Sequence, residues 1–275
     1  MIHRLHGLHG LHGLNVTGRA WAAALVLATV AGVTIVGETA GGEHAAVERL
    51  RAEVVRAYPH DRAAFTQGLV LHDGKLLEST GLVGKSSLRE VEVETGRVIR
   101  RIEVPPPIFA EGLALVGDEL IQLSWQNGTA LRYDLRTFAR RGEFSYRGEG
   151  WGLCHDGKSL IMSDGSANLT VRRPGDFGIA RVVTVTMDGK PLSQLNELEC
   201  ADGAVYANVW MQDLIVRIDP ATGRVTQRIE VPPLLSPLER KGVDVLNGIA
   251  YDAATKTFLI TGKLWPKLFR VRFVI

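Results

Sequence analysis

QGLVLHDGKLLEST (67–80) is a segment of the chain that has four counterparts further along. These are EGLALVGDELIQLS (111–124), WGLCHDGKSLIMSD (151–164), NELECADGAVYANV (196–209) and NGIAYDAATKTFLIT (247–261). Each segment consists of a short apolar run, a turn, and a second apolar run, and in three of the five the turn contains Asp-Gly. This pattern predicts two short antiparallel strands joined by a tight turn.

The spacing of these segments predicts how many units the fold contains. Their first residues lie 44, 40, 45 and 51 positions apart, and a second repeat, RVIRRIEVPPP (97–107), returns as RVTQRIEVPPL (224–234). Each strand pair is followed by a third strand, a turn and a fourth strand. Four short strands every 40 to 50 residues are typical of a propeller blade. Residues 54–275 therefore predict an all-β fold, a five-bladed β-propeller.

The two ends of the repeat region predict how the propeller closes. The fifth unit reaches Ile275 after only three strands, whereas EVVRAYP (53–59) precedes the first unit and belongs to none. We expect this N-terminal strand to complete the last blade, because that pairing removes an open sheet edge.

The composition excludes several classes of protein. The chain has 275 residues, 45% of them hydrophobic, which is enough for a sizeable core. Its 32 basic and 30 acidic residues form no like-charged block, so a nucleic-acid binder is not indicated. Two cysteines are too few for a disulfide-built scaffold and have no zinc-binding spacing.

The first 53 residues differ from the rest. Residues 1–14 repeat Leu-His-Gly, which we interpret as low-complexity sequence rather than as a metal-binding tract. The apolar segment 21–36 is short for a spanning helix and suits a secretory signal, with an uncleaved N-terminal anchor as the alternative. Either interpretation predicts a periplasmic or secreted protein, with no membrane contact except through that segment. Residues 41–53 are expected to form a polar linker or a short helix.

Equivalent positions of the blades predict a site at one mouth of the central channel. The first residues of the five units are Gln67, Glu111, Trp151, Asn196 and Asn247. The second strands return to the same mouth with Gly81, Trp125, Gly165, Trp210 and Lys263, and Phe65 and Phe109 each lie two positions before a leading residue. Aromatic walls with a few polar groups are the usual form of a small-ligand pocket.

Each of these residues also has a structural interpretation. A tryptophan can pack between blades, an asparagine can cap a turn, and a carboxylate can be paired; only their meeting at one mouth favours a site. The pairs His60–Asp61 and His155–Asp156 lie near turns, and we interpret them as structural. Cys154 and Cys200 suit small buried positions, and a bridge between them is possible without being required.

Several blocks of the chain resemble one known family. These are PHDRAAFTQGLVL, LLESTGLVGKSSLREV, FAEGLAL, GWGLCHDG, LNELE, ANVW, VLNGIAYD and TGKLWPKLF. They lie within about residues 58–270, and by them the chain resembles the plant and bacterial type of glutaminyl cyclotransferase. The resemblance implies a five-bladed propeller that converts the N-terminal glutamine of peptides to pyroglutamate and releases ammonia. Unlike the animal enzymes, this type is not a zinc aminopeptidase-like fold, so no metal or other cofactor is expected.

The resemblance also implies which residues form the pocket. They are Phe65, Gln67, Phe109, Glu111, Trp125, Trp151, Asn196, Trp210 and Lys263. The chain departs from plant members at Val83, where they have an aromatic residue, and at Cys154 and Cys200. These departures do not affect the polar pocket residues, which are Gln67, Glu111, Asn196 and Lys263.

We interpret Glu111 as the acid and base of the reaction, which burial among tryptophans would suit by raising its pKa. Gln67, Asn196 and Lys263 are expected to bind the amide oxygen and orient the substrate, and the aromatic residues to exclude water. The expected partners are peptides or proteins with N-terminal glutamine, and the expected state is a monomer. The alternatives are a non-enzymatic propeller that binds a peptide or sugar, and a metal-dependent lactonase, which would need several carboxylates at the axis.

Overall fold

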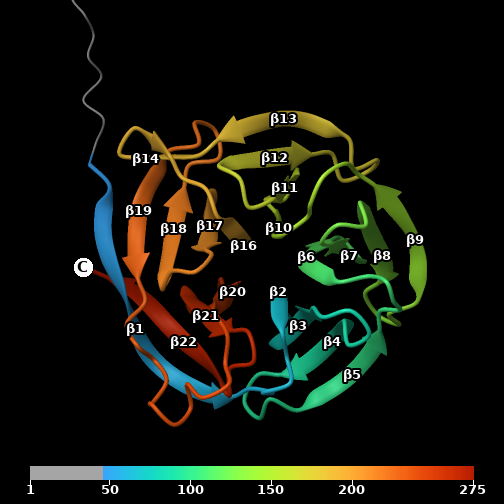
Figure 1. Ribbon diagram of the computed structural model, residues 1–275, viewed down its shortest axis with the longest axis horizontal. Coiled ribbons are helices and arrows are strands. Elements are labelled where there is room, and N and C mark those ends of the chain that lie inside the picture. Colours follow the sequence, from blue (N-terminus) through green and yellow to red (C-terminus); the bar gives the residue numbers. More distant parts are fainter. Residues whose placement is uncertain (1–45) are drawn as a thin grey trace, which may run out of the picture. The chain divides into compact units, whose positions relative to one another are not determined.

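Five four-stranded blades surround a central axis in the computed structural model, which describes residues 46–275 (Figure 1). Blade 1 contains β2 (Thr66–His72), β3 (Lys75–Thr80), β4 (Ser87–Glu92) and β5 (Val98–Glu103). Blade 2 contains β6 (Ala110–Val116), β7 (Glu119–Ser124), β8 (Thr129–Asp134) and β9 (Arg140–Ser145). Blade 3 contains β10 (Leu153–His155), β11 (Leu160–Met162), β12 (Asn168–Arg172) and β13 (Ile179–Thr184).

The remaining two blades share one continuous sheet. Blade 4 contains β16 (Leu195–Ala201), β17 (Ala204–Val209), β18 (Leu214–Ile218) and β19 (Val225–Glu230). Blade 5 contains β20 (Leu246–Asp252), β21 (Thr257–Gly262), β22 (Lys267–Val274) and, from the other end of the chain, β1 (Glu48–Pro59). A small hairpin, β14 (Thr186–Met187) with β15 (Lys190–Pro191), connects blades 3 and 4. The predicted all-β, five-bladed propeller is confirmed.

The closure of the propeller by an N-terminal strand is also confirmed. β1 pairs antiparallel with β22 from Arg51 opposite Val274 to Pro59 opposite Lys267. Its first four residues pair in parallel with β19 as well, which joins blades 4 and 5. In Figure 1, β1 runs along the outer edge of both blades.

The start of this strand differs from the predicted boundary at residue 54. β1 begins at Glu48, within the segment expected to be a polar linker or short helix. Leu50 packs against the core between blades 4 and 5, and Ala52 is buried in that core. These two alternate residues are enough to hold the start of the strand against the propeller. The predictions for residues 1–40 lie outside the described residues.

Two of the three Asp-Gly turns that the sequence indicated have the geometry of a tight hairpin. Asp73 and Gly74 join β2 to β3 with φ of 48° and 73°, and Asp202 and Gly203 join β16 to β17 with φ of 47° and 72°. Positive φ at both positions is what a two-residue type I′ hairpin needs, and Asp-Gly adopts it at low cost.

The innermost strands approach one another closely around the axis. A Cβ atom added to Gly68 or Gly112 would lie 2.5 Å from the backbone nitrogen of the next innermost strand, so only glycine fits there. The equivalent position of blade 4 carries Glu197 instead. Its fully buried carboxylate reaches across the axis and accepts the backbone N–H groups of Leu69 (3.2 Å) and Ile249 (2.8 Å). One side chain therefore connects the innermost strands of blades 4, 5 and 1.

Five apolar clusters fill the spaces between neighbouring blades, one for each pair. The core is thus a ring of interfaces around the axis, and the side chains at the strand ends remain available for a site. Within residues 46–275, no helix is long and apolar enough to cross a membrane.

Candidate active site

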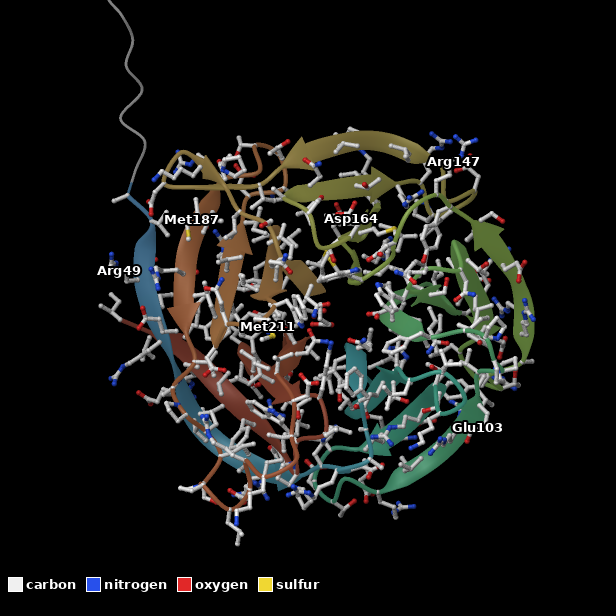
Figure 2. All side chains as sticks on the ribbon, viewed as in Figure 1. Arg49, Glu103, Arg147, Asp164, Met187 and Met211 are labelled. Carbon is white, nitrogen blue, oxygen red and sulfur yellow. A yellow bond between two sulfur atoms is a disulfide. The ribbon has the colours of Figure 1, made fainter. Side chains whose placement is uncertain are left out.

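A cavity of about 870 Å³ opens at the mouth of the central channel. Nine of the ten residues predicted for the site line it: Phe65, Gln67, Phe109, Glu111, Trp125, Trp151, Asn196, Trp210 and Lys263. Met211 lines it too and lies close to the central opening in Figure 2, whereas Arg49, Glu103 and Arg147 lie at the periphery. The structure therefore has a cavity at the mouth where the blade repeat predicts the site.

A local irregularity of the innermost strands directs the leading side chains into this cavity. The pairing register shifts between Thr66 and Gly68 in blade 1, and the same shift occurs at the start of β6, β16 and β20. Such a bulge leaves one residue unpaired and re-aims its side chain. Gln67 and Glu111 lie at these shifts, which explains why they face the mouth rather than a neighbouring strand.

Glu111 is the central polar group of the cavity. It is 5% exposed, and its Oε1 accepts a hydrogen bond of 2.8 Å from Gln67 Nε2. Burial raises the pKa of Glu111 well above its usual range; the charge of Lys263 opposes this effect and that of Glu149 adds to it. A carboxyl group with a raised pKa can both accept and donate a proton near neutral pH.

Lys263 directly follows β21 and faces the same cavity from blade 5. Burial lowers the pKa of its ammonium, while the charges of Glu111 and Asp244 act in the opposite direction. Its Nζ lies 5.0 Å from the centroid of the Phe65 ring, a distance at which the ring face attracts a cation. Lys263 therefore places a positive charge at a wall of the cavity.

Asn247 is the one predicted site residue that does not line the cavity. It is fully buried behind Gln67, and its Nδ2 donates to Gln67 Oε1 (3.1 Å) and to the carbonyl of Thr66 (3.0 Å). The prediction of a substrate contact is wrong for this residue, because its carboxamide is used to hold Gln67. A chain of amides, Asn247 to Gln67 to Glu111, fixes the orientation of the carboxyl group.

Asn196 differs from these two amides. Among residues 46–275, no side-chain hydrogen bond engages its carboxamide, although it is 3% exposed and lines the cavity. A buried amide without protein partners is unfavourable unless a bound molecule or water satisfies it. Asn196 is therefore free to bind a ligand.

Aromatic rings form most of the cavity wall. Phe109 lies between Phe65 and Trp125, with ring centroids 6.0 and 5.8 Å apart and edge-to-face contacts. Trp151 and Trp210 meet in the same manner at 5.8 Å. These walls are apolar, and they make burial of Glu111 costly enough to shift its pKa.

Two glycines at the mouth, Gly81 and Gly165, make room for these rings. A Cβ atom at Gly81 would overlap the ring of Phe109, and one at Gly165 would lie 2.7 Å from the indole of Trp151. Gly262 has the same role for Trp265, a wall residue that the sequence reasoning missed.

Sequence reasoning also missed Glu149. Its Oε2 accepts hydrogen bonds from the indole nitrogens of Trp125 (2.8 Å) and Trp151 (2.9 Å), and its Oε1 accepts one from Gln126 (2.9 Å). These bonds lower the pKa of Glu149, with the contribution of Gln126 the largest. A signal was present, because Glu149 lies two residues before Trp151, as Phe65 and Phe109 lie two residues before Gln67 and Glu111.

Glu149 supports the wall without lining the cavity, and the other missed residues, which do line it, come mainly from the β19–β20 connection. They are Leu235, Arg240, Val243, Asp244, Val245 and Leu246, together with Met211 and Asp213 from the β17–β18 turn. Beyond residue 234 this connection has no counterpart of similar sequence in the other blades, so the repeat gave no information about these wall residues.

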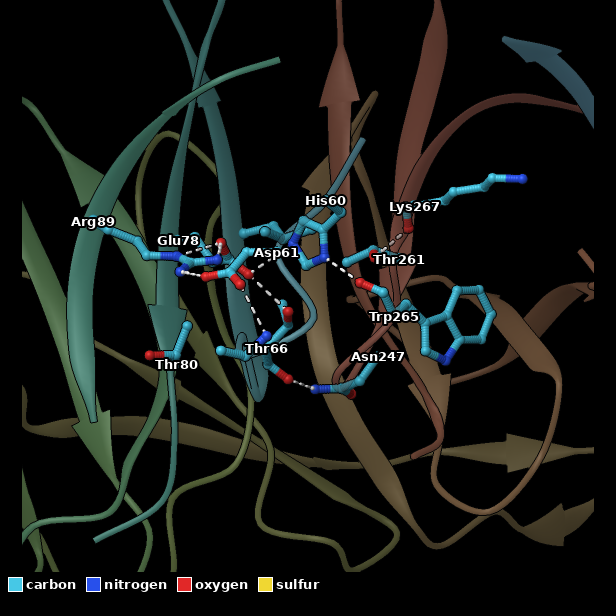
Figure 3. Close-up of polar contacts among 12 residues, drawn as sticks. His60, Asp61, Thr66, Glu78, Thr80, Arg89, Asn247, Thr261, Trp265 and Lys267 are labelled. Atoms are coloured by element: carbon cyan, nitrogen blue, oxygen red, sulfur yellow. Dashed lines mark hydrogen bonds and ion pairs between the residues drawn. The ribbon is translucent and has the colours of Figure 1, made fainter. Parts of the chain in front are cut away.

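His60 and Asp61 belong to a polar network beside the cavity and not to its lining (Figure 3). Glu78 is fully buried and accepts bonds from Thr66 Oγ1 (2.7 Å), Arg89 Nε (2.8 Å) and His60 Nε2 (3.1 Å). Arg89 also binds Asp61 at 2.7 Å. The structural interpretation of this pair is therefore supported, since the network holds the segment that precedes Gln67.

The protonation of His60 follows from this network. Its Nδ1 lies 2.9 Å from the carbonyl oxygen of Trp265, so both ring nitrogens face acceptors and both must donate. Burial by itself lowers the pKa of His60, but the charge and hydrogen bond of Glu78 outweigh it and raise that pKa.

A disulfide joins Cys154 of β10 to Cys200 of β16, with Cα atoms 5.4 Å apart. The sequence had left this bridge open. It connects the innermost strands of blades 3 and 4, which supply Trp151 and Asn196 to the cavity. His155 and Asp156 follow, and Asp156 Oδ1 accepts the backbone N–H groups of Lys158 and Ser159 as a turn residue.

The chemistry available to this site is proton transfer in a largely apolar pocket. A buried carboxyl group of raised pKa, an ammonium group and an unengaged amide face one space. Within residues 46–275, no three His, Cys, Asp or Glu side chains are grouped so that they could hold a metal ion.

Comparison with known proteins gives three findings. The model of a family described as glutamine cyclotransferase matches residues 15–273. A glutaminyl-peptide cyclotransferase of Arabidopsis thaliana is 43% identical over 230 residues, which are 80% of this chain and 70% of that protein. The crystal structure of Myxococcus xanthus glutaminyl cyclase superposes with a TM-score of 0.75 at 39% identity, and the match covers 83% of this chain and 98% of that one.

Proposed function

Because the chain belongs to the glutamine cyclotransferase family, we propose that this pocket converts the N-terminal glutamine of peptides and proteins to pyroglutamate and releases ammonia. The observation that carries the assignment to this pocket is the buried carboxyl group of Glu111, whose Oε1 accepts from Gln67 and whose Oε2 has no hydrogen-bond partner among residues 46–275. That oxygen faces a cavity with aromatic walls and an ammonium group.

The reaction takes place within one residue. The α-amine nitrogen attacks the carbon of the γ-carboxamide, a new C–N bond closes the five-membered lactam, and the bond to the amide nitrogen breaks. A proton passes from the attacking amine to the departing nitrogen, which leaves as ammonia. The protein must therefore fold the side chain back on itself and carry that proton.

Glu111 carries the proton at Oε2. An α-amino group has a pKa of about 7.7–8.0, and a carboxyl group whose pKa is raised toward that range exchanges protons with it at little cost. Glu111 accepts the proton as the ring closes and returns it to the leaving nitrogen. Gln67 acts as a positioning residue, because its amide holds Oε1 and is itself held by Asn247.

Asn196 and Lys263 remain to bind the amide oxygen as it gains negative charge. The carboxamide of Asn196 has no protein partner in the described part of the chain, and Lys263 supplies a positive charge from the neighbouring blade 5. Donors placed in advance in this way stabilise a transition state by about 3–4 kcal/mol each.

The aromatic walls enclose the aliphatic part of the glutamine side chain and exclude water, which would otherwise release glutamate. The cavity of about 870 Å³ is several times the volume of one such side chain. Met211, Leu235 and Arg240 line this cavity as well, and its volume gives room for the following residues of a peptide.

Mass spectrometry tests this function directly. The full chain is incubated with a peptide that begins with glutamine, and the expected result is a loss of 17 Da. The same peptide with an acetylated N-terminus should not react, because its nitrogen cannot attack. The Glu111→Gln variant should fold normally and give no loss of mass; activity near the wild-type level in that variant would refute the role of Glu111.

We also propose that the protein acts outside the cytoplasm and as a monomer. The apolar segment 21–36 suits a secretory signal or an anchor, and the Cys154–Cys200 disulfide suits an oxidising compartment. Charged residues such as Arg101 and Arg140 on the outer strands β5 and β9 disfavour edge-to-edge association. Cell fractionation, N-terminal sequencing of the mature protein and light scattering after gel filtration test these points.

A further inference from the structure

A carboxylate joins two aromatic rings of the pocket wall that do not contact each other. Edge-to-face contacts connect Phe65 to Phe109 and Phe109 to Trp125, and another such contact connects Trp151 to Trp210. Between Trp125 of blade 2 and Trp151 of blade 3 there is no ring contact among the described residues. The two indoles are joined instead by the single oxygen Oε2 of Glu149, at 2.8 and 2.9 Å.

The backbone around Glu149 is fixed for this purpose. Gly150 N donates to the carbonyl of Trp125 at 2.9 Å, so the segment is tied to Trp125 through both backbone and side chain. A Cβ atom at Gly150 would overlap the hydroxyl of Tyr146, so this close approach requires glycine. The carboxylate is thus placed by the fold and not by the flexibility of its own side chain.

From this geometry we propose that Glu149 is a positioning residue for cyclisation, which clamps two indoles into one wall and sets a negative charge beside Glu111. This inference rests on the proposed function. Glu149 is not a second base, because three donors already occupy its two oxygens. It acts on the reaction through Trp125, Trp151 and Glu111.

The effect of Glu149 on Glu111 depends on the other charges around Glu111. Lys263 favours the ionised form of Glu111, and Glu149 favours the protonated form; Tyr146 also faces Glu111, and Asp244 acts on Lys263. Glu149 therefore contributes to the raised pKa of Glu111. Without its charge, Glu111 should ionise at lower pH.

Two substitutions separate the clamp from the charge. In Glu149→Gln the amide oxygen can occupy the place of Oε2 and still accept from both indoles, while the charge is lost. Glu149→Ala removes the charge and both hydrogen bonds. Glu143→Gln is the control, because Glu143 is an exposed carboxylate of β9 that pairs with Arg140 far from these contacts.

The pH dependence of kcat distinguishes the two effects, since it reports groups of the enzyme–substrate complex. In Glu149→Gln the acidic limb should move to lower pH by about half a unit to one unit, with KM nearly unchanged. Glu149→Ala should show the same movement and in addition a roughly tenfold to hundredfold loss of kcat/KM. If the acidic limb of the kcat profile does not move in Glu149→Gln, the role of the Glu149 charge is refuted. If the two variants have equal kcat/KM, the role of Glu149 in clamping the indoles is refuted.

Tryptophan fluorescence tests the clamp without relying on turnover. Quenching of indole emission by acrylamide should increase in Glu149→Ala and remain at the wild-type level in Glu149→Gln and Glu143→Gln. Quenching in Glu149→Ala identical to the wild type would overturn the clamp. If the wild type fails to cyclise any glutaminyl peptide, the proposed function fails, and this measurement still decides the clamp.

Discussion

Glu197 offers the sharpest test of how the propeller is held together at its axis. Four of the five repeats place glycine after the leading residue, and the fourth places this glutamate there. The substitution Glu197→Gly would restore the pattern of the other blades. It would also leave the backbone N–H groups of Leu69 and Ile249 buried without an acceptor.

The expected loss follows from those two groups. A buried donor left without a partner costs about 1–3 kcal/mol, so the variant should lose about 2–6 kcal/mol of the free energy of unfolding. Typical domains have about 5–15 kcal/mol in total, so such a loss is a large fraction. For a chain of this size it corresponds to a decrease of Tm by roughly 5–20 °C.

Thermal and denaturant unfolding of the wild type and the variant measure this difference. The matched control is Glu199→Gly on the same strand, since this carboxyl group accepts one backbone hydrogen bond within the described residues, from Tyr251 N at 2.9 Å, and the loss of that bond should cost less. If Glu197→Gly unfolds within about 0.5 kcal/mol of the wild type, water replaces the carboxylate at the axis and the reasoning from buried donors is wrong.

Three further predictions concern the positive charge of Lys263, the Cys154–Cys200 disulfide and the buried His60. Lys263→Met should lower kcat about a hundredfold to a thousandfold and move the acidic limb of its pH profile upward, because the cation that favours ionised Glu111 is gone; an unchanged limb would contradict this. Replacing Cys154 and Cys200 together by alanine should cost about 4 kcal/mol in denaturant unfolding, since the bridge closes a loop with a sequence separation of 46; a loss below about 1 kcal/mol would exclude this effect. The pKa of His60 is raised in the folded state, so its contribution to stability is complete below about pH 6.5 and is lost as the pH rises through the folded-state value. Between about pH 6 and 10 the Tm should therefore fall more steeply with pH in the wild type than in His60→Gln. Parallel plots of Tm against pH would refute this contribution of His60.

The sequence predicted the parts of this protein that repeat. Gln67, Glu111 and Asn196 were located because a blade places equivalent residues at one mouth, and their difference in type indicated function rather than packing. The same comparison failed for Asn247. Its place as the first residue of a unit fixes where its backbone lies, but not whether a neighbouring side chain covers its carboxamide. Gln67 lies in front of Asn247 and takes its hydrogen bond.

Other features were missed because they depend on contacts between blades. Glu149 stands at an equivalent position to Phe65 and Phe109, but its role appears only when two indoles from different blades meet it. The wall formed by the β19–β20 connection belongs to one blade and has no internal comparison. β1 was placed on the correct partner, but its first residues pair with β19, whose free edge the sequence did not reveal.

The closing strand has a consequence for how the protein is made. Arg51 pairs with Val274, so the last blade cannot form until nearly the whole chain has been synthesised. Contacts so distant in sequence are slow to form, and until β22 has been synthesised β1 lacks its antiparallel partner and presents an unpaired edge that can join other chains. A protein assembled in this order depends on its final eight-residue strand, and loss of that strand should lead to aggregation during biosynthesis rather than to a slightly less stable enzyme.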